Sequence, residues 1–109
     1  METSSSSEIY IVFWFDKEAR ESGYDFVSEF SMLRTFRNLE DAKKYINQDL
    51  ETYKNRLAHR PDLQSQIQIN NFQFSEYGAN VFSFSNPFRD FYYIKCLNST
   101  YIIVKQELY

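Results

Sequence analysis

The sequence predicts an α+β domain in which one main helix packs on one face of an antiparallel sheet of about five or six strands. Three observations predict this class: one long amphipathic helix pattern, two strand patterns before it, and strand patterns joined by short turns after it. A chain of 109 residues is near the commonest domain size. We therefore expect a disordered polar tail over residues 1–7 and a single domain over 8–109.

The first two strands are predicted to form a hairpin. Residues 9–15 are β-branched or aromatic at every position, which is typical of a strand buried on both faces or of one whose second face meets a partner. Charged residues and a glycine then predict a hairpin loop from Asp16 to Gly23. Residues 24–36 fit either a strand or a helix, and we favour the strand because a hairpin loop precedes it and a clearer helix follows.

The helix has recognisable start and stop signals. Asn38 is a good N-cap, Asp41 can reach back toward it, and Pro61 stops further helix. Apolar residues recur at three- and four-residue spacing, at Leu39, Ala42, Ile46, Leu50, Tyr53 and Leu57. The expected core places the later part of this stripe against rings of the sheet, with Ile46, Leu50, Tyr53 and Leu57 packed on Phe13, Phe30 and Phe72.

Strand patterns fill the remainder of the chain. The alternation that begins at Ile67 changes phase at Asn70-Asn71, which predicts a bulge or a tight turn. The other expected elements are a hairpin connection at 77–80, a strand at 81–85, and two strands at 91–97 and 101–108 joined through 98–100.

Composition and charge bear on the kind of partner. The net charge of −3 does not favour a nucleic-acid binder, because phosphate neutralisation by basic residues supplies most non-specific affinity. The same charge is too weak for a mimic of DNA. Aromatic residues make up 19% of the chain, and we expect some of these rings in the core and some on an exposed binding face.

The sequence also indicates a compartment. Cys96 is the only cysteine and lies in a strand pattern, which predicts a buried, inert thiol. The N-terminus lacks the basic and apolar regions of a signal peptide, and the apolar run from Ile9 to Phe15 is too short to cross a bilayer. We expect a cytoplasmic protein without membrane association.

Residues for catalysis, metal binding or cofactor binding are not recognisable. His59 is the only histidine, and at the predicted C-terminal end of the helix it is expected to be solvated. One histidine and one cysteine give no metal-ligand spacing, and two glycines do not make a phosphate-binding loop. We therefore expect no enzyme activity, no metal and no cofactor.

The predicted binding residues lie in the first hairpin. The acidic hairpin tip suits contact with a basic protein surface, and alternation along residues 9–15 is expected to place Tyr10 and Trp14 on the face of the sheet that the helix leaves uncovered. An exposed apolar patch with Trp and Tyr is typical of an interface, here with a target protein or a second copy. The predicted partner-binding residues are Tyr10, Trp14, Asp16, Glu18 and Glu21.

Two other functions stay open. A small nucleic-acid-binding domain would use rings of the sheet and the basic set at the helix end, with Tyr53 nearby; this set consists of Lys54, Arg56, His59 and Arg60. A carboxylate-dependent hydrolase would need a pocket that holds two close carboxylates.

The chain as a whole, rather than any motif, resembles one group of proteins. Its small size, acidic balance, many Phe, Tyr and Asn residues and lack of catalytic residues are similar to those of small phage inhibitors of bacterial defence systems, such as anti-CRISPR proteins. This resemblance implies a non-catalytic, stoichiometric inhibitor of a bacterial defence nuclease or similar enzyme, acting by surface binding. It assigns no functional residue, because that group has no shared motif.

Overall fold

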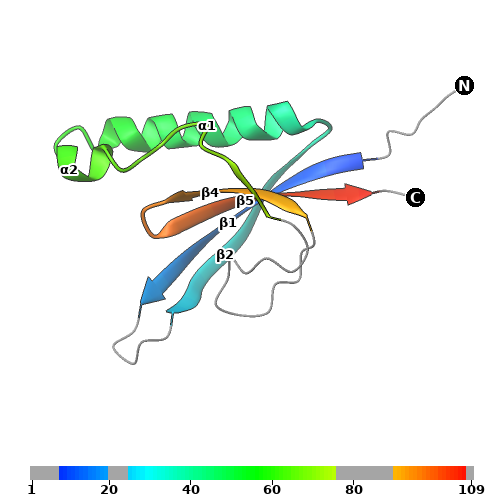
Figure 1. Ribbon diagram of the computed structural model, residues 1–109, viewed down its shortest axis with the longest axis horizontal. Helices are drawn as coiled ribbons and strands as arrows, with labels where there is room; N and C mark the ends of the chain where they lie inside the picture. Colours follow the sequence, from blue (N-terminus) through cyan, green and yellow to red (C-terminus); the bar gives the residue numbers. More distant parts are fainter. Residues whose placement is uncertain (1–7, 20–24, 76–89, 108–109) are drawn as a thin grey trace, which may run out of the picture.

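The computed structural model describes residues 8–19, 25–75 and 90–107 and confirms the predicted α+β class (Figure 1). In these residues five antiparallel strands form one open sheet in the order β2-β1-β5-β4-β3, and the main helix α1 lies across one face. The elements, in chain order, are β1 (Glu8–Ala19), β2 (Asp25–Phe36), α1 (Leu39–Arg56), α2 (Pro61–Gln64), β3 (Gln73–Ser75), β4 (Phe91–Cys96) and β5 (Ser99–Glu107). The predicted tail at 1–7, the connection at 77–80 and the strand at 81–85 lie outside the described residues.

Strand β1 extends further than the sequence predicted. Asp16 and Glu18 belong to the strand, where they pair with Glu29 and Phe26 of β2, so the prediction of a loop beginning at Asp16 is wrong. The reason is that the ladder is made by backbone groups, which pair equally well beneath charged side chains. The strand prediction for 24–36 is confirmed by β2. Glu21 lies outside the described residues.

Helix α1 begins where the sequence predicted. The Asp41 backbone N–H donates to Asn38 Oδ1 at 2.8 Å, and Asn38 Nδ2 donates to Asp41 Oδ2 at 2.9 Å. Acidic residues in the first turn and basic residues in the last turn complement the helix dipole. The helix ends at Arg56, and Pro61 does not stop it but opens α2, because a proline at the first helical position loses no hydrogen bond.

The helix-side core contains only part of the predicted apolar stripe. Ile46 and Leu50 are at most 1% exposed, and half-buried Leu57 packs against the cluster from beyond the helix end, as expected, whereas Tyr53 is 38% exposed. The sheet contributes the other buried members of this cluster, and Phe72 packs against it. The buried residues are Val12, Ala42, Ile46, Leu50, Ile67, Ile94, Cys96, Tyr101 and Ile103.

Both faces of β1 are buried, but the helix covers the face opposite to the one predicted. Tyr10 and Trp14 pack against the helix-side cluster, whereas Phe13 packs on the other face with buried Phe15 and Phe91. The predicted alternation of side chains along β1 is therefore confirmed, whereas the predicted choice of the face that the helix covers is wrong. Side-chain size does not identify the helix-covered face, because Val12 on one face and Phe15 on the other are both fully buried. The side chain of Phe30 is outside the described part.

The segment between the helices and β3 is tied to α1 by two asparagines. Asn70 adopts a φ of 63°, its backbone N–H donates to Asn47 Oδ1 at 2.7 Å, and Asn47 Nδ2 donates to Asn70 Oδ1 at 3.3 Å. Asparagine tolerates this left-handed conformation better than most residues. The turn predicted at Asn70-Asn71 is thus present, although the strand that follows is limited to β3.

Candidate binding cleft

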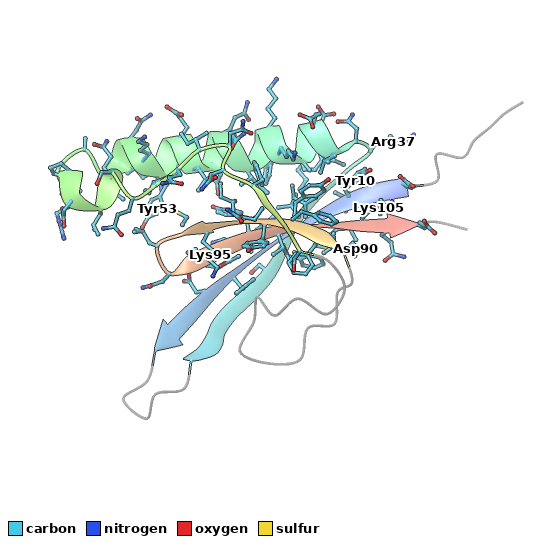
Figure 2. All side chains as sticks on the ribbon, in the orientation of Figure 1. Tyr10, Arg37, Tyr53, Asp90, Lys95 and Lys105 are labelled. Atoms are coloured by element: carbon cyan, nitrogen blue, oxygen red, sulfur yellow. The ribbon has the colours of Figure 1, made fainter. Side chains whose placement is uncertain are left out.

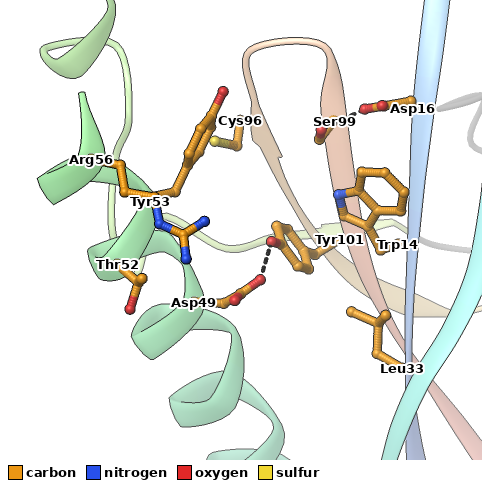
Figure 3. A pocket seen from close by; sticks show the side chains of 10 residues that line it. All are labelled: Trp14, Asp16, Leu33, Asp49, Thr52, Tyr53, Arg56, Cys96, Ser99 and Tyr101. Atoms are coloured by element: carbon orange, nitrogen blue, oxygen red, sulfur yellow. Dashed lines mark hydrogen bonds between the residues drawn. The ribbon is translucent and has the colours of Figure 1, made fainter.

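A cleft of about 440 Å³ opens between the C-terminal half of α1 and the sheet (Figure 3). Five elements line it: β1, β2, α1 and the two strands of the β4–β5 hairpin. Its lining is mixed, with aromatic, carboxylate, hydroxyl and guanidinium groups. The lining residues are Trp14, Asp16, Leu33, Asp49, Thr52, Tyr53, Arg56, Cys96, Ser99 and Tyr101.

Strand alternation brings Trp14 and Asp16 to the cleft. They are two residues apart on β1 and therefore share its helix-facing side. Asp16 pairs in the ladder with Ser99 of β5, and Ser99 Oγ donates to Asp16 Oδ1 at 2.5 Å. This hydrogen bond joins residues 83 positions apart and fixes the orientation of the Asp16 carboxylate.

Ser99 owes its position to a tight turn. The turn consists of Leu97 and Asn98 alone, so Ser99 and Thr100 belong to β5 rather than to the turn predicted at 98–100. Leu97 adopts a φ of 56°, a conformation uncommon for a residue with a branched side chain. The short turn holds Cys96 and Ser99 opposite each other at the edge of the cleft.

A second carboxylate enters from the helix. Asp49 accepts a hydrogen bond from the hydroxyl of Tyr101, a β5 residue that is only 7% exposed (Figure 3). Burial raises the pKa of the Tyr101 hydroxyl far above its usual value, and the hydrogen bond to Asp49 raises it further. Tyr101 therefore stays protonated over the ordinary pH range and acts as a donor to Asp49.

Helix spacing accounts for the remaining polar wall. Thr52 and Tyr53 are each three or four residues from both Asp49 and Arg56, so the four side chains lie on one side of α1. Figure 3 shows Arg56 with its guanidinium group on the same side of the cleft as Asp49. The hydroxyl of Thr52 donates back to the Gln48 carbonyl at 3.0 Å, so its proton is used within the helix.

Cys96 is buried, as predicted. The residue is 2% exposed, and burial raises the pKa of its thiol to about 11, with the charge of Asp49 adding a smaller increase. The reactive form of cysteine is the thiolate, so this thiol is largely unreactive near neutral pH. His59 is exposed in the turn after α1 and does not line the cleft.

The cleft contains two of the five residues predicted to bind a partner. Trp14 and Asp16 line it, whereas Tyr10 lines a smaller cavity of about 220 Å³ near the start of α1. Figure 2 shows Tyr10 and Tyr53 near opposite ends of the helix. Glu18 lies two residues beyond Asp16 on β1, but its side chain is outside the described part, as is the whole of Glu21.

Asp49, Thr52, Ser99 and Tyr101 were not predicted as site residues, whereas Tyr53 was predicted in the core and Arg56 in the nucleic-acid alternative. The polar spacing of Asp49, Tyr53 and Arg56 was a usable signal, because it marks a second stripe beside the apolar one. Ser99 and Tyr101 gave no such signal. Their roles depend on the register of β5 against β1, which no local pattern specifies.

Residues 8–19, 25–75 and 90–107 contain no cluster of three or more His, Cys, Asp or Glu side chains that could hold a metal ion. None of the helices in these segments is long and apolar enough to span a membrane. Comparisons of the chain with protein-family models, with curated proteins and with solved structures found no match. The fold and its cleft therefore define the class only as an α+β domain with a mixed polar and aromatic cleft.

Proposed function

We propose that this chain is a non-catalytic protein-binding module whose partner docks at the cleft between α1 and the sheet. The observation that supports this most strongly is the lining of the cleft. Leu33 and Tyr53 are 37% and 38% exposed, and with Trp14 they surround a few oriented polar groups. Exposed aromatic and aliphatic anchors around oriented polar groups are the usual composition of an interface hot spot.

The groups in the cleft favour binding over catalysis. Nucleophilic catalysis would need an activated side chain, and the pKa of about 11 leaves the Cys96 thiol protonated at neutral pH. The hydrolase alternative requires two close carboxylates, and the cleft is lined by Asp16 from β1 and Asp49 from α1. However, a carboxyl general acid depends on burial, and Asp49 is exposed while Asp16 is half-buried.

The charge of the cleft favours a protein over a nucleic acid. Among the described lining residues, two carboxylates and one guanidinium give a net formal charge of −1, which would repel phosphates. The more specific form of the proposal is the one implied by the resemblance to phage inhibitors, namely stoichiometric inhibition of a bacterial defence nuclease or a similar enzyme in the cytoplasm.

The test compares two exposed aromatic residues at different places. Tyr53 lines the cleft, whereas Phe74 is 51% exposed and lines only the smaller cavity. A partner captured by the wild-type chain from a bacterial lysate is purified, and its stoichiometry is measured by native mass spectrometry. We expect a complex of defined stoichiometry that Tyr53→Ala weakens about tenfold or more, as for a hot-spot residue, while Phe74→Ala leaves the dissociation constant unchanged.

Two outcomes would contradict this proposal. One is a complex that Phe74→Ala weakens and Tyr53→Ala does not, which would place the interface elsewhere. The other is captured material that nuclease treatment removes and whose binding falls steeply with salt, which would favour the nucleic-acid alternative.

A further inference from the structure

The two carboxylates of the cleft are held in place by neutral donors. Ser99 Oγ donates to one oxygen of Asp16 and the Tyr101 hydroxyl to one oxygen of Asp49. Within the described residues neither carboxylate has a cationic group within the 4.0 Å of an ion pair. Since an ionised carboxylate has about four acceptor positions, both keep the capacity to accept from a further donor.

The described residues also place no cation on the aromatic walls of the cleft. Figure 3 shows the indole of Trp14 and the ring of Tyr53 on opposite sides of the cleft, with Tyr101 between them. Ring faces carry partial negative charge and attract ammonium and guanidinium groups within about 6 Å of the ring centre. In the part of the chain that the structure describes, no cation lies over any of these three rings.

The same chain shows a cation bound by rings near the start of α1. The Lys43 ammonium lies 5.6 Å from the ring centre of Phe72 and 4.8 Å from that of Tyr92. At the cleft the one lining cation is Arg56, which is exposed and makes no ion pair within the described residues. One further positive charge would bring the net formal charge of the described lining residues to zero.

From these observations we infer that the cleft receives the ammonium or guanidinium group of a lysine or arginine side chain of the partner protein. Asp16 and Asp49 accept from the charged group, while Trp14 and Tyr53 enclose it and its apolar stem. Hydrogen bonds between a cation and a carboxylate are the stronger kind, and their value increases where a ring excludes water. The inference rests on the proposed function and adds the chemistry of the partner's anchor.

The test uses the single tryptophan of the chain as its reporter, since Trp14 lines the cleft. Nα-acetyl-lysine N-methylamide is titrated at constant ionic strength while Trp14 emission is followed. The norleucine and glutamate analogues serve as uncharged and anionic controls. We expect a saturable change with the lysine compound and none with the two controls.

Two variants on the same helix remove one negative charge each. Asp49→Asn keeps an oxygen that accepts from Tyr101, so the fold is retained, and we expect it to weaken binding of the lysine compound about tenfold or more. Glu51→Gln is the matched control, because Glu51 is exposed and does not line the cleft, and it should leave the affinity unchanged.

Three results would overturn the inference: equal binding of the norleucine compound, tighter binding of the glutamate compound, or no saturable change with any of them. If one of these occurs while Tyr53→Ala still weakens the partner complex, the charge assignment fails and the proposed function stands. If Tyr53→Ala leaves the partner complex intact, the proposed function fails and this inference fails with it.

Discussion

The two ends of the helix–sheet interface use similar side chains to different effect. Near the start of α1 the chain supplies both rings and cations, with the Arg34 guanidinium 5.8 Å from the ring centre of Phe36 and 5.9 Å from that of Tyr45. At the other end it supplies rings and carboxylates around a cleft and places no cation on them within the described residues. We expect the contacts at the first end to contribute to stability, and we propose that the groups at the second end bind a partner.

The largest effect is expected in the core between these two ends. Leu50 is 1% exposed, so Leu50→Ala should lower the free energy of unfolding by about 2–5 kcal/mol through lost transfer energy and a cavity. Urea denaturation measures the change. Glu51 is the neighbouring exposed residue, and Glu51→Ala should change the free energy of unfolding by no more than about 0.5 kcal/mol. An equally small change for Leu50→Ala would show that α1 is not packed as described.

A smaller effect is expected from a hydroxyl at the cleft. Tyr101→Phe keeps the buried ring but removes the donor to Asp49, and it should cost about 1 kcal/mol of unfolding free energy. Tyr92→Phe is the control near the start of α1, because its hydroxyl makes no hydrogen bond in the described segments. If the two substitutions have equal effects, the Tyr101–Asp49 bond contributes nothing to stability.

Double-mutant cycles compare the two ends directly. The pair Lys43→Met and Tyr92→Leu should show a coupling energy of about 0.5–1 kcal/mol, since the ammonium lies over that ring. The pair Arg56→Met and Tyr53→Leu should show a coupling energy near zero. A coupling energy for this second pair as large as that of the first pair would mean that the Arg56 guanidinium already lies over the Tyr53 ring.

A further effect concerns pH. Burial raises the pKa of Cys96 from 9.0 to about 11, so the protonated thiol is favoured in the folded state. Its contribution to stability is complete below pH 9 and is lost as the pH rises toward 11, because the unfolded chain then releases a proton that the folded chain retains. The unfolding free energy of the wild type should therefore fall more steeply over this range than that of Cys96→Ala, and parallel slopes would contradict the burial effect.

Sequence and structure agree best where the signals are local. The N-cap at Asn38 and the spacing of Ile46 and Leu50 each depend on neighbouring residues, and the structure confirms them. The reach of β1 beyond Asp16 was not predictable from composition, because charged side chains are usual in loops and the backbone ladder does not depend on them. The face of the sheet on which Trp14 lies was also not predictable. Such an assignment depends on a difference between an apolar and a polar face, and β1 lacks that difference because both of its faces are buried.

The cleft was predictable only in part. Trp14 and Asp16 are close in sequence, and their aromatic and acidic character predicts that they bind a partner. That prediction placed Trp14 on an uncovered face of the sheet and Asp16 in a loop. Their ladder partners come from β5, about 85 residues later, through the pairing of Asp16 with Ser99 and of Trp14 with Tyr101. Such register is fixed by the assembled sheet rather than by any short pattern.

The proposed cleft accepts a cationic side chain, whereas the start of α1 does not. Amide and indole N–H chemical shifts, recorded by NMR during titration with Nα-acetyl-lysine N-methylamide, distinguish the two regions most directly. We expect saturable shifts at Trp14, Asp49 and Tyr53, and none at Lys43 or Tyr92. Shifts centred on Lys43 and Tyr92, or no saturable shift at the cleft, would contradict this proposal.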